Sequence, residues 1–98
     1  MDEHLIFDEY FQEPLDNLPN NLKILEIYSN YEQKLDFLPV SLEELHLYRY
    51  MGELRNLPPN LKILGVHEDN ENEFILPENC KLRHYWFYRK KGGSWTYW

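Results

Sequence analysis

The chain has 98 residues, which is enough for one small domain but too short to bury a large core. Its net charge of −7 disfavours nucleic acid as a partner, and the single cysteine, Cys80, excludes an internal disulfide and fits a reducing, cytoplasmic compartment. No stretch is apolar for long enough to span a membrane, and the acidic start lacks a signal-peptide pattern.

The first predicted element is a short strand over residues 4–8, inside a half repeat that covers residues 1–17. Leu5 and Phe7 occupy its two inward positions, because side chains along a strand face alternate sides. Apolar residues return 20 positions later, at Leu25 and Ile27. The chain therefore begins with the end of a repeating unit.

Three full repeats follow, over residues 18–37, 38–56 and 57–75, and each begins with Leu-Pro. Their shared pattern is LPxxLxxLxL, and a fixed period near 20 residues indicates a solenoid of stacked units. The inward strand positions are Leu25 and Ile27, Leu45 and Leu47, and Leu64 and Val66. The segments between strands are too short for an α-helix, so we predict turns or 3-10 segments on the convex side. Proline after each leucine suits a turn that enters a strand.

The last unit, residues 76–98, departs from this pattern. Strict spacing places three residues inside: Cys80, Arg83 and Tyr85. Burying Arg83 without a partner would be costly. Treating Glu78-Asn79 as an insertion instead places Leu82, Tyr85 and Phe87 inside, and we favour that register.

The chain ends with two aromatic-rich runs around Gly92-Gly93, a pattern that predicts a β-hairpin. A solenoid has an apolar end that a terminal unit must cover. We expect Trp95 and Trp98 to form this cap.

The segment from Leu18 to Asn30 reads LPNNLKILEIYSN and resembles the leucine-rich repeat superfamily. Its short period is similar to FNIP repeats, whose FNxPL-like segment is matched by Phe11 to Leu15, and to the LPxxLxxL units of bacterial effectors. The resemblance covers about residues 5–88. It implies a mainly β solenoid with one parallel sheet of about five short strands.

The resemblance also implies binding of a protein partner, and it carries over no catalytic residue and no cofactor. The FNIP branch resembles amoebal and giant-virus proteins, which implies a viral protein that interacts with host proteins in the cytoplasm. The superfamily's internal asparagine ladder is matched at Asn30, whereas Tyr50 and Asp69 stand at the corresponding positions of later repeats. We therefore expect this ladder in the first repeat only.

Side chains that alternate with the inward leucines form columns on the outward face of the sheet. Exposed aromatic residues on a rigid sheet are typical of binding hot spots, although tyrosines stacked across strands can serve stability alone. We predict a protein-binding face with these contacts: Ile24, Tyr28, Glu44, His46, Tyr48, Ile63, His67, His84, Trp86 and Tyr88.

All four histidines fall on this predicted face, but they lie on four different strands. A metal site needs three or four converging ligands, so we predict none. Histidines that titrate between about pH 5 and 7 would instead make binding pH-dependent.

Two other functions remain open. Residues 1–78 hold 17 acids and 5 bases (−12), whereas residues 79–98 hold 5 bases and no acid (+5). A basic, aromatic tail suits nucleic acid or an acidic partner, through Arg83, Arg89, Lys90, Lys91 and Trp95. Opposite charges at the two ends also suit head-to-tail self-assembly through the solenoid ends. The sequence contains no phosphate-binding loop and no nucleophile motif, so we expect no enzyme activity.

Overall fold

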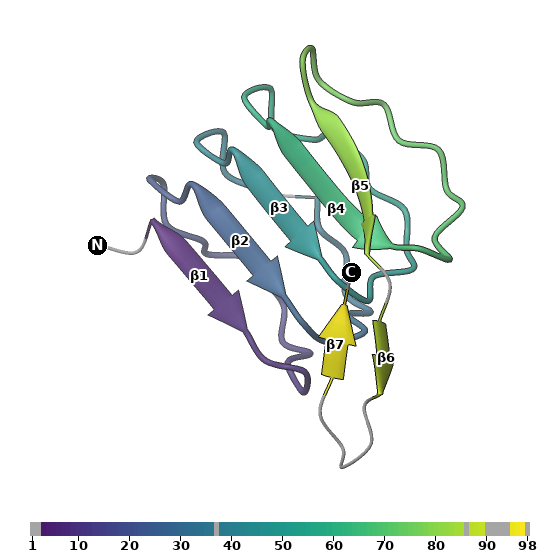
Figure 1. The fold of residues 1–98 in the computed structure, drawn as a ribbon. Coiled ribbons are helices and arrows are strands. Elements are labelled where there is room, and N and C mark those ends of the chain that lie inside the picture. The colour runs from purple at the N-terminus through teal and green to yellow at the C-terminus, as the bar shows by residue number, and fades with distance from the viewer. Residues whose placement is uncertain (1–2, 37, 86, 90–94, 98) are drawn as a thin grey trace.

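The computed structural model describes residues 3–36, 38–85, 87–89 and 95–97. These residues form a β-solenoid of about four turns and contain no helix. Five strands make one parallel sheet in the order β1-β2-β3-β4-β5 (Figure 1). Their bounds are His4–Phe7 (β1), Ile24–Ile27 (β2), Glu44–Leu47 (β3), Ile63–His67 (β4) and Lys81–Tyr85 (β5). The predicted mainly β solenoid with five short strands is confirmed.

An antiparallel hairpin of β6 (Phe87–Arg89) and β7 (Trp95–Tyr97) follows the sheet. The predicted hairpin is therefore present. Its role as a cap stays a prediction, because it depends on the side chain of Trp95 and on Trp98, which lie outside the described side chains.

The core consists of rows of apolar side chains, and each row runs across the strands through the inward residues at one strand position. Leu25, Leu45 and Leu64 align across β2, β3 and β4, and all three have 0% exposure. Parallel strands of equal register place the inward residues of successive repeats directly over one another. The predicted alternation therefore holds from β1 to β4.

Each repeat enters its strand through the same β-turn. The carbonyl of the proline accepts a hydrogen bond of 3.1–3.2 Å from the amide three residues later, at Pro19, Pro39, Pro58 and Pro77. Proline lacks an amide hydrogen, but its carbonyl is free to close this turn. The convex side consists of turns and extended segments in the ranges described above (Figure 1).

Both predicted registers for the last repeat are wrong. Leu82, and not Arg83 or Tyr85, pairs with Leu64. The segment between turn and strand is one residue shorter than in earlier repeats, and Asn79 closes the turn with a φ of 66°, which asparagine tolerates. Arg83 and Tyr85 consequently face outward, and His84 takes an inward position.

The predicted asparagine ladder is also wrong. Asn30 is exposed, and its side-chain oxygen accepts a hydrogen bond from Gln12. Asn70 is the buried asparagine: its amide donates to the backbone carbonyls of Tyr50 and Gly52, at 3.1 and 3.0 Å. This side chain ties two consecutive repeats together on the convex side of β4.

Candidate protein-interaction face

The outward face of the sheet carries three rows of side chains, one residue per strand. The row nearest the strand starts contains His4, Ile24, Glu44, Ile63 and Lys81. The middle row contains Ile6, Glu26, His46, Gly65 and Arg83. The third row, near the strand ends, contains Tyr28, Tyr48, His67 and Tyr85.

These tyrosines form a continuous stack across four strands. The ring centroids of Tyr28 and Tyr48 lie 4.4 Å apart, and those of Tyr48 and Tyr85 lie 4.7 Å apart. Tyr48 is 4% exposed and Tyr85 is 8% exposed. Most of their surface is therefore used for packing within the face, as in the stability alternative.

Tyr85 reaches its place because residue 65 has no side chain. A Cβ added to Gly65 would lie 2.1 Å from Cε2 of Tyr85. The tyrosine ring crosses over this glycine, and its hydroxyl lies 2.5 Å from Nδ1 of His46. Glycine in a strand often marks such a close approach.

Two carboxylates are held by histidine and tyrosine beneath this stack. Oε1 of Glu26 accepts a hydrogen bond of 2.5 Å from the Tyr48 hydroxyl, and Oε2 lies 2.5 Å from Nε2 of His4. Oε1 of Glu44 lies 2.9 Å from Nε2 of His46. The middle of the face is thus an internally satisfied polar network.

These contacts shift two pKa values in opposite directions. Partial burial opposes ionisation of Glu26, but hydrogen bonds from Tyr48 and His4 outweigh it and lower the pKa below 4.5. Burial raises the pKa of the Tyr48 hydroxyl, and the neighbouring Glu26 raises it further. Near neutral pH, Glu26 is the charged acceptor and Tyr48 the neutral donor.

A lowered carboxyl pKa makes part of the stability depend on pH. Glu26 contributes stability above about pH 4.5, and this contribution is lost as the pH falls through its lower pKa in the folded state. We expect Glu26→Gln to cost about 1 kcal/mol at pH 7 and less at pH 3. Urea unfolding of both proteins at the two pH values measures this. An equal difference at both would contradict the prediction.

One segment of the chain that contributes to this face matches a known protein family. Residues 11–50 match the family model described as FNIP Repeat. Over this segment the chain is similar to FNIP repeats. Comparison with curated proteins and comparison with solved structures gave no significant match. The match confirms the predicted resemblance over less than half of the chain, and it includes β2 and β3.

Some side chains of the outward face remain accessible to a partner. Ile24 and Ile63 are half-buried, and Ile6 on β1 is 59% exposed. Lys81 and Arg83 are exposed, and neither makes an ion pair with another residue that the structure describes. On the β4–β5 side of the face, Ile63 therefore adjoins two cations that have no ion-pair partner among the described residues.

The structure brings most of the predicted contact residues to this face. Seven of them lie there, namely Ile24, Tyr28, Glu44, His46, Tyr48, Ile63 and His67. The prediction for His84 is wrong, because it takes an inward position of β5. Tyr88 belongs to the hairpin strand β6, and Trp86 lies outside the described residues. Sequence reasoning missed Lys81, because its predicted register placed that residue before the strand.

The alternative tail site is dispersed over several elements. Arg83 lies on the outward face of β5, Arg89 ends β6, and Trp95 begins β7. Lys90 and Lys91 lie outside the described residues.

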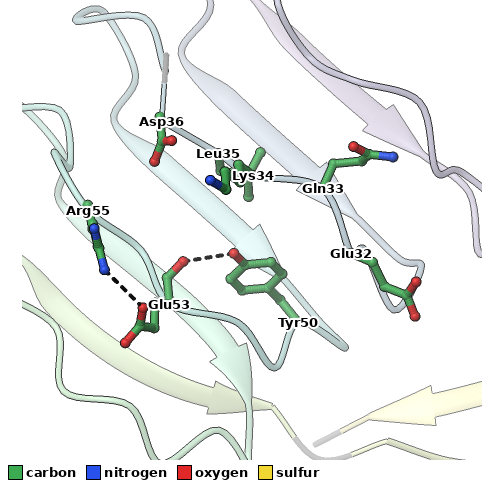
Figure 2. Close-up of a pocket in the computed structure, with 8 residues that line it drawn as sticks. All are labelled: Glu32, Gln33, Lys34, Leu35, Asp36, Tyr50, Glu53 and Arg55. Carbon is green, nitrogen blue, oxygen red and sulfur yellow. Dashed lines mark hydrogen bonds and ion pairs between the residues drawn. The ribbon is translucent and has the colours of Figure 1, made fainter.

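The convex side also carries a hollow of about 380 Å³, lined by residues of two repeats (Figure 2). Its lining mixes acids with bases: Glu53 bonds Arg55 at 3.4 Å, and its carbonyl accepts a 2.8 Å hydrogen bond from Tyr50. A small-molecule site usually has a mainly apolar lining, which this hollow lacks.

Within the described parts of the chain, no three ligands gather to hold a metal ion. The same residues include no helix with the length and apolarity that crossing a membrane requires.

Proposed function

We propose that this chain is a protein-interaction module that binds its partner through the outward face of the sheet. The FNIP match supports a repeat-based interaction module in general. The observation that carries the proposal is the patch of Ile63 on β4 with Lys81 and Arg83 on β5, where an apolar side chain adjoins two cations that make no ion pair with any described residue. A partner that supplies apolar and acidic side chains complements both properties.

The size of the face limits the kind of partner. Five strands about 4.8 Å apart, each four or five residues long with about 3.3 Å per residue, make a face roughly 20 Å by 15 Å. A standard protein interface buries about 800 Å² on each side, which is well above this area. An extended acidic segment of a partner fits the face better than a broad domain surface.

The buried side chains of the face have a supporting role in this proposal. Three of them, Tyr48, His46 and Tyr85, contact one another by a hydrogen bond or by ring stacking. Each of these residues is at most 9% exposed. They hold the face flat and rigid, which lowers the entropy lost when a partner binds.

We expect Ile63→Ala/Arg83→Ala to weaken partner binding by at least about tenfold, since it removes one apolar and one charged contact. The matched control is Ile75→Ala/Arg55→Ala, which removes the same residue types from exposed positions on the convex side. Bound proteins are first identified from cell extract by mass spectrometry. The affinity of the identified segment is then measured by calorimetry. Equal affinity of both variants would reject this face as the binding site.

A further inference from the structure

The parallel sheet has an unpaired edge at each end. Among the described strands, β1 pairs only with β2 and β5 pairs only with β4, while the hairpin forms a separate sheet (Figure 1). Unpaired strand edges offer backbone donors and acceptors to another strand.

At the ends of β1, the Glu3 carbonyl accepts hydrogen bonds from the amides of Lys23 and Ile24, and the Phe7 carbonyl accepts one from the amide of Tyr28. Successive residues of a strand point their backbone groups to opposite sides, so those of His4 and Ile6 point to the free edge. On β5, the Lys81 amide donates to the Lys62 carbonyl, and the Tyr85 carbonyl accepts from the Glu68 amide, on either side of β4. The backbone groups of Leu82 and His84 point to the other free edge by the same rule.

The two edges match each other in register. The aligned inward row runs through Leu5, Leu25, Leu45, Leu64 and Leu82. Continuing the row places Leu5 of a second copy beside Leu82. In a parallel ladder, the backbone groups of Leu82 then face those of His4 and Ile6 of that copy, which are the groups left free on β1.

The side chains at the two ends are also incompletely buried. Leu82 points toward the inward side of the sheet and is nevertheless 37% exposed. Leu5 and Phe7 at the other end are half-buried. Stacking one end on the other would remove these apolar surfaces from water, as each repeat does for its neighbour within the chain.

Charge distinguishes a second copy from other partners for these edges. Glu3, Asp8 and Glu9 lie at the β1 end without an ion pair to any described residue. Lys81 and Arg83 are cations at the β5 end that likewise make no ion pair with any described residue. One end of this chain is thus complementary in charge to its other end, and not to itself.

We propose that the chain self-associates head to tail, with β1 of one copy added as a parallel strand to the free edge of β5 of the next. The contact uses two different surfaces, so each assembly keeps one free edge of each kind and grows with concentration. It goes beyond the proposed function, because it uses the backbone edges of the sheet and shares only Lys81 and Arg83 with the outward face that the proposed function assigns to a partner.

Two charge-reversed variants test the contact by sedimentation velocity at low salt. Lys81→Glu/Arg83→Glu makes the β5 end acidic, and Glu3→Lys/Glu9→Lys makes the β1 end basic. Each variant alone is expected to associate at least about tenfold more weakly than wild type, because its two ends repel. An equimolar mixture is expected to regain association. A mixture that stays monomeric would overturn the proposal, as would a wild-type protein that is monomeric at every concentration.

Two controls separate the edge contact from general effects. Lys34→Glu/Arg55→Glu makes the same change in net charge as Lys81→Glu/Arg83→Glu, at exposed positions away from both edges, and is expected to associate like wild type. Ile6→Pro removes the amide that faces the free edge of β1 and is expected to abolish association, whereas Ile6→Thr keeps that amide and the association. Circular dichroism checks that each variant is folded. Association of folded Ile6→Pro at the wild-type level would refute the added-strand contact.

Discussion

Replacing Leu45 by alanine is expected to destabilise the protein by about 3 kcal/mol. Leu45 has 0% exposure and lies in the middle of the inward row, between Leu25 and Leu64. Its removal opens a cavity between two repeats whose hydrogen-bonded strands prevent them from closing it. A loss of this size is a large part of the 5–15 kcal/mol that typically stabilises a small domain.

The matched control is Leu82→Ala, the same substitution in the same row at the end of the sheet. Because Leu82 is already 37% exposed, we expect Leu82→Ala to lower the free energy of unfolding by no more than about 1 kcal/mol. Urea unfolding followed by far-ultraviolet circular dichroism measures both, at concentrations low enough to avoid self-association. Equal losses for the two variants would mean that the last repeat is packed as tightly as the centre.

The repeat period was sufficient to predict the sheet from β1 to β4. Leu-Pro marks the same β-turn in each repeat, and the leucines after it keep constant offsets, so inward and outward positions follow directly. The last strand could not be predicted this way. Its turn leads into β5 one residue early, at Asn79, and a shift of one residue exchanges the two faces of a strand.

The outward direction of a side chain could be predicted, but its burial could not. Tyr48 and His46 face outward as expected, yet both are buried because the ring of Tyr85 crosses from β5 to reach them. This crossing depends on the register of β5. Gly65 was the one signal in the sequence, since a glycine inside a strand indicates that another group approaches closely.

Replacing Asn70 by alanine is expected to cost about 2–3 kcal/mol, the second large effect. The side chain is 3% exposed, and its amide donates to two backbone carbonyls of the preceding repeat, those of Tyr50 and Gly52. Its oxygen accepts a hydrogen bond from the Asn72 amide. Leaving buried backbone groups without partners costs about 1–3 kcal/mol for each group, and water can replace only part of what is lost.

The comparison with Asn30→Ala decides which asparagine ties the repeats together. The family pattern points to Asn30, but this residue is exposed, so its loss is expected to change stability by no more than about 0.5 kcal/mol. Urea unfolding of both variants measures the difference. A larger loss at Asn30 would favour the ladder position of the family pattern. A larger loss at Asn70 would mean that the hydrogen bonds from its buried amide to the turn after β3 hold the two repeats together.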